Sequence, residues 1–144
     1  MTGRQHHRKL ERMYAAAPIN EYFAPRLRVD HGEAELQIDV RPDFHHAAGA
    51  MHGVVYFKAL DDATFFAANS LVEDVFVLTA GFEIQFLKPV IDGTICARAR
   101  VTEEQGSRIV AVGELFDSQN RLVGRGTGSF ARSKIRLTPE VHYR

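Results

Sequence analysis

Two adjacent carboxylates in an otherwise apolar segment are the residues of this chain best suited to chemistry. Residues 52–70 have the length of a helix, contain no proline and carry formal charge only at Lys58, Asp61 and Asp62. At about 100° per residue, Asp62 lies beside its i,i+4 neighbour Lys58, which predicts a polar, partly wet edge, whereas Asp61 lies in an apolar sector. Because an unpaired carboxylate is costly to remove from water, we expect Asp61 to act as a general base or nucleophile. The structural alternative is that Asp61 caps a backbone or pairs with a distant arginine, and Asp62 is expected to be structural.

The start of the same helix is the second feature with chemical potential. The segment Gly49-Ala-Met-His52-Gly53 leads into the first turn, whose backbone N–H groups lack intrahelical acceptors. Such a terminus stabilises developing negative charge, and Gly53 has no Cβ to keep a substrate carbonyl at a distance. An N–H donor combined with a sequestered carboxylate is suited to acyl transfer.

A helix that is apolar nearly all round is a buried helix, so a sheet must wrap it. Alternating apolar residues predict a strand pair over 27–40 and further strands over 82–86, 95–101, 108–117 and 121–133. The spacing predicts an antiparallel meander and hence an α+β fold with the helix inside the curled sheet. Residues 41–51 are predicted to be a loop. Three glycines fall on one face of the last strand, at 124, 126 and 128, and predict close approach by a packed helix or a ligand.

Length and composition are those of an ordinary globular protein. The chain has 144 residues, 45% hydrophobic and 25% charged, with 18 basic and 18 acidic side chains, which predicts one domain over 1–144 and no nucleic acid or membrane partner. Residues 4–17 predict a short N-terminal helix with one apolar stripe, and His6 and His7 are expected in solvent. The single cysteine Cys96 and the lack of an apolar leader or membrane span predict a cytoplasmic location.

Other constellations of reactive residues carry less weight. His45, His46 and His52 lack the spacing of a helical zinc pair and have no cysteine companions, so we expect no metal. The chain also lacks a G-x-S-x-G elbow and a glycine-rich phosphate loop, which disfavours a serine hydrolase and a nucleotide-dependent enzyme. Arg132 and Lys134 either line the path of an anionic substrate or protect a strand edge.

The motifs on and after the long helix resemble those of a known family. Residues 49–53, 59–61 and 67–70 resemble the G-x-x-H-G-G-(x)6-A-D segment of hotdog-fold thioesterases of the phenylacetic-acid-degradation (PaaI-like) branch. Residues 81–89 and 124–130 are similar to strand sequences of the same branch.

The resemblance implies a hotdog core over residues 25–133, in a homodimer or dimer of dimers with active sites between subunits. It implies hydrolysis of an acyl-coenzyme A thioester without metal, with coenzyme A as part of the substrate and no other cofactor. Asp61 matches the catalytic acidic residue of the family, and Gly53, preceded by His52, matches the residue whose N–H binds the thioester oxygen. Thr79 aligns with a position where some relatives carry a hydroxyl that orients water.

Two positions depart from the family motif. Val54 replaces its second glycine, and His46 replaces an asparagine that precedes the motif, which would make activity sensitive to pH. We expect Gly49 and Val54 to contact the substrate near the helix start, and Arg132 and Lys134 to contact the nucleotide end of coenzyme A.

Two other functions remain compatible with these residues. One is an acyl-CoA-binding or regulatory hotdog module without turnover, and the other is a hotdog dehydratase acting on 3-hydroxyacyl thioesters. The acyl group also stays open, because phenylalanines such as Phe57 and Phe65 suit an aryl pocket, a fatty-acyl pocket or plain core.

Overall fold

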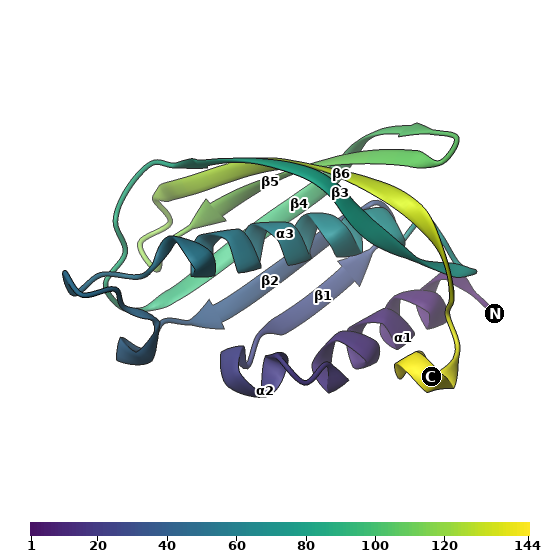
Figure 1. Cartoon of the computed structure of the whole chain (residues 1–144), viewed down its shortest axis with the longest axis horizontal. Helices are drawn as coiled ribbons and strands as arrows, with labels where there is room; N and C mark the ends of the chain where they lie inside the picture. The colour runs from purple at the N-terminus through teal and green to yellow at the C-terminus, as the bar shows by residue number, and fades with distance from the viewer.

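The chain folds into a single curled sheet with one long helix in its hollow. A computed structural model describes residues 1–144. Its elements are α1 (Gly3–Ala16), α2 (Asn20–Phe23), β1 (Arg26–Asp30), β2 (Glu33–Asp39), η1 (Pro42–Phe44), α3 (Gly53–Asn69), β3 (Val75–Phe86), β4 (Thr94–Gln105), β5 (Arg108–Phe116), β6 (Leu122–Arg136) and η2 (Pro139–Val141), where η marks a 3₁₀ helix. Figure 1 shows α3 across the sheet, with α1 and η2 near the two chain ends. None of the helices combines the length and apolar character needed to cross a bilayer.

The six strands form one antiparallel sheet in the order β1-β2-β4-β5-β6-β3. The predicted α+β class and curled sheet are confirmed, but the meander is correct only for β4, β5 and β6. β3 follows α3 and pairs with β6 at the edge opposite β1. The sequence did not predict this pairing, because alternation indicates which residues face the core and not which strand lies alongside. β3 also begins at Val75, well before the predicted start at Phe82, since irregular pairing near Val77 and Gly81 disturbs the alternation.

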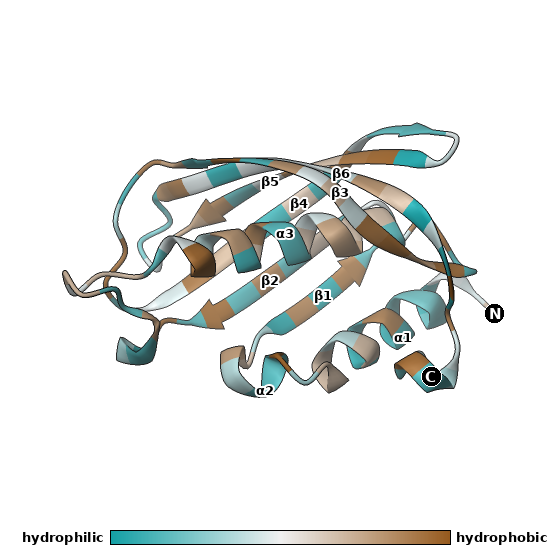
Figure 2. Cartoon of the chain, in the orientation of Figure 1, coloured by the Kyte–Doolittle hydropathy of each residue, from teal (hydrophilic) through white to brown (hydrophobic).

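α3 occupies the centre of the core, as its composition predicts. Ten of its seventeen residues are buried, and it packs against β2, β4 and β5. Ala59, Ala63 and Ala67 recur at every fourth position and are at most 1% exposed, so the helix lies close to the sheet. Figure 2 shows that apolar colouring predominates along α3. Its three charged side chains lie where α3 faces α1 and the turn after it, at Lys58 and Asp62, and where it faces β3, at Asp61.

The glycines of β6 make room for aromatic rings. A Cβ on Gly126 would lie 2.5 Å from the Phe82 ring, and one on Gly128 would lie 2.6 Å from the Phe130 ring and 3.1 Å from the Phe82 ring. Only Gly124 faces the helix, where a Cβ would lie 3.3 Å from the Tyr56 ring. The prediction of a helix or ligand against this face is therefore wrong for Gly126 and Gly128. Phe82 of the neighbouring strand β3 and Phe130 of β6 itself occupy that space instead.

The N-terminal helix carries two buried histidines, so the expectation that His6 and His7 lie in solvent is wrong. His6 is fully buried and His7 is 6% exposed. His6 Nε2 lies 2.9 Å from the Asn69 carbonyl oxygen, and Nδ1 lies 2.6 Å from the Tyr143 hydroxyl. A carbonyl only accepts, so Nε2 donates to the Asn69 carbonyl, and Nδ1 pairs with the Tyr143 hydroxyl. His6 precedes Leu10 by four residues, so it lies on the same buried face of α1. Its hydrogen-bond partners are in α3 and in the C-terminal segment.

We expect His6→Ala to lower the free energy of unfolding by about 2–4 kcal/mol, because it leaves two buried polar partners unpaired and opens a cavity. The matched control is His31→Ala in the exposed β1–β2 turn, which should change stability by less than about 0.5 kcal/mol. Urea unfolding followed by circular dichroism measures both. Equal stability of the two variants would contradict a structural role for His6.

Candidate active site

Asp61 lies in the middle of α3 and faces β3. Thr79 Oγ1 of β3 donates a hydrogen bond to Asp61 Oδ1 at 2.9 Å. None of the ion pairs of the chain includes Asp61, so the alternative of a distant arginine partner is not observed. The fold thus brings together two residues that the sequence nominated, which are 18 positions apart.

The surroundings of Asp61 make its side chain harder to ionise than a free aspartate. The pKa of Asp61 is raised to about 6, mainly by burial, with a smaller contribution from the negative charge of Asp62; the Thr79 hydrogen bond and the Lys58 charge act in the opposite direction. A carboxylate with a pKa near the working pH accepts a proton readily without being permanently protonated.

Asp62 is held in a different environment. Its Oδ2 accepts from Lys58 Nζ at 2.6 Å and from the Tyr14 hydroxyl at 2.5 Å. Lys58 Nζ also donates to Asn20 Oδ1 at 2.7 Å. The Lys58 and Asp62 side chains are only 10% and 18% exposed, so the expectation of a partly wet edge is wrong: α1 and the turn after it cover the pair. The predicted i,i+4 pair is present and supports a structural role for Asp62.

The start of α3 presents an unused donor. His52 is the N-cap, and its Nδ1 accepts from the Val54 N–H at 2.9 Å. The Gly53 N–H donates to no acceptor in the chain. Val54 is 52% exposed and lies one turn from the exposed Phe57. The helix terminus therefore faces outward with a free N–H, in an apolar setting.

Two histidines of the loop before α3 bond to backbone groups, one within the loop and one in the segment after β3. His46 Nδ1 accepts from the Ala48 N–H at 3.1 Å, and His45 Nε2 bonds to the Ile91 carbonyl oxygen at 2.7 Å. Gly49 has φ +83°, a left-handed conformation that favours glycine. No group of three or more His, Cys, Asp or Glu side chains is arranged to hold a metal.

The two basic residues proposed for substrate contact lie away from Asp61. Arg132 donates to the Gly106 carbonyl oxygen and to Glu104 Oε2, both in the β4–β5 hairpin. Neither Arg132 nor Lys134 lines the cavity beside Asp61. Arg132 thus has a structural use in the single chain, and the structure does not join either residue to the carboxylate.

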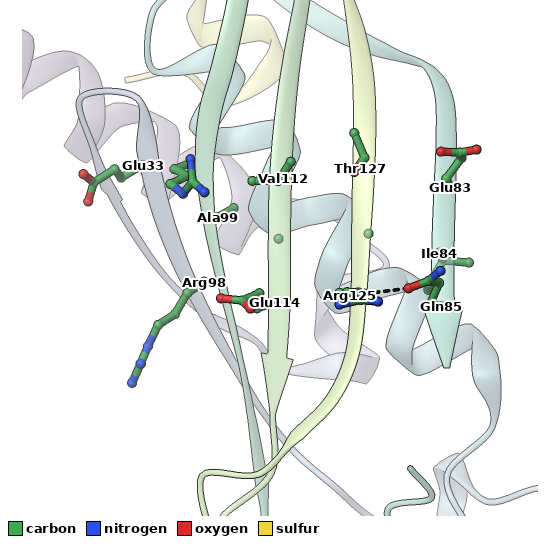
Figure 3. A pocket seen from close by; sticks show the side chains of 13 residues that line it. Glu33, Glu83, Ile84, Gln85, Arg98, Ala99, Val112, Glu114, Arg125 and Thr127 are labelled. Atoms are coloured by element: carbon green, nitrogen blue, oxygen red, sulfur yellow. Dashed lines mark hydrogen bonds between the residues drawn. The ribbon is translucent and has the colours of Figure 1, made fainter. Parts of the chain in front are cut away.

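Two large hollows exist, and only one contains nominated residues. The larger, about 880 Å³, lies on the outer face of the sheet, where acidic and basic side chains such as Arg98, Glu114 and Arg125 alternate across the strands (Figure 3). The other, about 640 Å³, lies between α1, α3 and β3, is lined mostly by apolar side chains, and includes Asp61 and Thr79. The chemistry points to the second hollow, which we call the Asp61 cavity.

The sequence did not reveal that α1 builds one wall of the Asp61 cavity. Tyr14 and Asn20 line it, as do Phe66 of α3 and Phe76 of β3. Tyr14 falls on the predicted apolar stripe of residues 4–17, which signals docking but does not identify the surface that receives it. The contact with Asp62 depends on how α1 crosses α3, and spacing along one helix carries no information about that crossing.

Gly53 and Asp61 do not meet within one chain. They are eight residues apart on α3, which corresponds to about 12 Å along the helix axis. One thioester carbonyl therefore cannot accept from the Gly53 N–H and contact Asp61 of the same copy. The two functional ends of α3 are separate in the single chain.

Comparison with known proteins places this geometry in a family. A family model described as "Thioesterase superfamily" matches residues 48–124, more than half of the chain. A protein of Saccharolobus solfataricus named "Putative esterase" is 29% identical over 104 residues, which are 72% of this chain and 69% of that protein.

Solved structures share the fold over nearly the whole chain. The PaaI protein of the E. coli phenylacetic acid degradation operon superposes with a TM-score of 0.86 at 21% identity, covering 96% of this chain and all of that one. A thioesterase family protein of Silicibacter pomeroyi superposes with a TM-score of 0.80 at 24% identity, covering 90% and 97%. With a buried helix wrapped by a curled sheet and a family match that spans its catalytic carboxylate candidate, this chain belongs to the thioesterase superfamily and has the hotdog fold.

Proposed function

We propose that this protein is a metal-independent acyl-coenzyme A thioesterase in which Asp61 is the catalytic carboxylate. The observation that carries the proposal is that Asp61 is partly desolvated, has no ionic partner and borders an apolar cavity. Superfamily membership and the esterase name of the archaeal relative support hydrolysis of a thioester or ester bond in general. The proposal adds to this general activity the coenzyme A substrate and the catalytic role of Asp61.

Asp61 offers one oxygen for the reaction. Thr79 occupies Oδ1, and no side chain or backbone group of the chain donates to Oδ2. Oδ2 either takes a proton from water as the water oxygen attacks the carbonyl carbon, or attacks that carbon itself to form an anhydride that water then opens. In both routes the carbon–sulfur bond breaks, the coenzyme A thiolate leaves and takes a proton, and a free acid remains.

The second half of the site comes from another copy of the chain. β3 is an unpaired edge strand, and exposed apolar side chains lie beside that edge on Val54, Phe57, Leu78 and Phe86. A partner that pairs with this edge would cover them. A two-fold arrangement would bring the free N–H of one helix start toward Asp61 of the other copy, which resolves the separation along α3. We propose a homodimer, or a dimer of dimers, with two such sites per dimer.

Replacement of Asp61 tests the proposal directly. We expect Asp61→Asn to reduce thiol release from a panel of acyl-CoAs by about 100-fold or more, because the amide neither accepts a proton nor attacks. The variant should stay folded and gain roughly 1–3 kcal/mol of stability at pH 8. The raised pKa means that the folded state loses stability as pH rises from about 4 through about 6, and asparagine lacks that loss.

The matched control is Asp62→Asn on the next residue. It should lose less than about tenfold in activity yet lower stability by about 2–3 kcal/mol, because it leaves the buried Lys58 ammonium without its partner. Equal losses of activity in the two variants would reject Asp61 as the catalytic carboxylate. Binding of acyl-CoA by the wild-type protein without thiol release would instead establish a non-catalytic binding module.

The pH profile provides a second test. Asp61 must be ionised to act, so kcat/KM should rise with pH through an apparent pKa near 6 and be lost below it. Thr79→Val removes the hydrogen bond that lowers this pKa, so the acidic limb should move to higher pH, and Thr79→Ser should restore it. Rates measured with one acyl-CoA between about pH 4.5 and 8 decide the point. A limb that does not move in Thr79→Val would contradict the assignment to Asp61.

Replacing Gly53 by proline or by alanine distinguishes the role of its backbone N–H from the role of its missing side chain, because only proline removes the N–H. Proline is tolerated at the first position of a helix, and the extended φ and ψ of His52 suit the residue before proline. We expect Gly53→Pro to lower kcat by about 100-fold or more through loss of the donor. Gly53→Ala places a Cβ against the same Phe86 ring but keeps the N–H, and it should retain most of the activity.

Mixing the two inactive variants tests the shared site. Dimers formed from Asp61→Asn and Gly53→Pro chains contain one site with both native residues, so re-equilibrated mixtures should recover about a quarter of wild-type activity. As the control, each variant is taken through the same procedure alone at the same total protein concentration, and it should remain inactive. No recovery in subunits shown to exchange would contradict an active site between copies.

A further inference from the structure

The Asp61 cavity has a wall that lies outside the part of the chain matched by the family. The match covers residues 48–124, whereas the cavity is also lined by Met13, Tyr14, Ala17, Pro18, Ile19 and Asn20 on one side and by Ile135, Val141 and His142 on another. The N-terminal part of this wall, residues 13–20, we call the α1 wall. These residues lie outside the family match, so the match by itself does not describe this wall.

The cavity presents apolar surface that no part of the chain covers. Ile19 and Ile135 line it and are 57% and 43% exposed. Phe65 and Phe76 form its aromatic interior, with ring centroids 5.1 Å apart. Exposed apolar side chains gathered around a hollow mark a site for an apolar ligand, and this hollow has the size of a small-molecule pocket.

The α1 wall is fixed to the helix that carries Asp61. Tyr14 donates to Asp62, Lys58 donates to Asn20, and Asn20 Nδ2 donates to the Tyr14 carbonyl oxygen at 2.7 Å. These bonds join both ends of the wall to α3, at Asp62 next to Asp61 and at Lys58 one turn before it. A ligand in the cavity is therefore held at a set distance from the carboxylate, so the wall limits how far it extends.

We infer that the Asp61 cavity holds the acyl group of the substrate, that this group is apolar and larger than acetyl, and that the α1 wall determines its size. The inference rests on the proposed function for the identity of the scissile bond. It adds the class of acyl group and the specificity-determining segment. Each buried methylene of such a group contributes to binding, so longer acyl chains are favoured until they meet the wall.

Ala17 is the position at which the wall can be moved without disturbing the catalytic residues. It lines the cavity, is half-buried, and has the extended backbone (φ −64°, ψ 131°) that precedes a proline and accepts any L side chain. Phenylalanine there would fill cavity space. Ala16 is its exposed neighbour and does not line the cavity, so Ala16→Phe is the matched control.

Hydrolysis is measured with acetyl-, butyryl-, octanoyl- and dodecanoyl-CoA, with benzoyl-CoA as the aryl arm. For the wild-type protein, kcat/KM should be at least about tenfold higher for octanoyl- or benzoyl-CoA than for acetyl-CoA. Ala17→Phe should lower the ratio of kcat/KM for the larger substrates to kcat/KM for acetyl-CoA by at least about tenfold, whereas Ala16→Phe should keep the wild-type ratio. A wild-type preference for acetyl-CoA, or equal effects of the two variants, would overturn the inference.

Binding separates this inference from the proposed function. Calorimetry compares coenzyme A with a non-hydrolysable thioether analogue of octanoyl-CoA, on wild-type, Ala17→Phe and Ala16→Phe proteins shown by thermal unfolding to be folded. The analogue should bind more tightly than coenzyme A, and only Ala17→Phe should lose that gain. If no thioester is hydrolysed but this binding pattern holds, the proposed function fails and the acyl cavity stands. If thioesters are hydrolysed but the analogue gains nothing, the acyl cavity is wrong.

Discussion

A carboxylate withdrawn from water without being neutralised is the constraint on which this molecule depends. Asp61 and Asp62 are adjacent, yet Asp62 receives a lysine and a tyrosine, whereas Asp61 receives one threonine hydroxyl. The difference arises from the elements that cover each side chain: α1 closes over Asp62, and β3 passes beside Asp61. One residue is thereby used for packing, and its neighbour keeps an elevated pKa and a free oxygen.

The fold can tolerate such a group because the rest of α3 is committed to the core. Its small residues let the sheet approach closely, and the sheet curls until β3 and β6 close over the helix. That closure is incomplete at the outer edge of β3. The same edge supplies Thr79 and leaves apolar side chains exposed. The candidate site therefore lies where the single chain has an unpaired strand edge and uncovered apolar surface.

The N-terminal helix links stability to the site. Its buried face joins the C-terminal segment and the end of α3 through His6, and its last turn joins the middle of α3 through Tyr14. An element at the margin of the hotdog core thus shapes the cavity beside the carboxylate. Under the proposed function, this segment would shape the acyl site while α3 supplies the carboxylate.

The sequence by itself determined the α+β class, the buried helix at residues 52–70, the Lys58–Asp62 pair and the separate character of Asp61, because these follow from period and composition along one segment. Tertiary structure alone decided that β3 pairs with β6, that Phe82 fills the space above Gly126, and that His6 is buried. It also decided that α1 walls the cavity. Each of these depends on which surfaces meet across the core, and a one-dimensional pattern marks a face as apolar without naming the face that covers it.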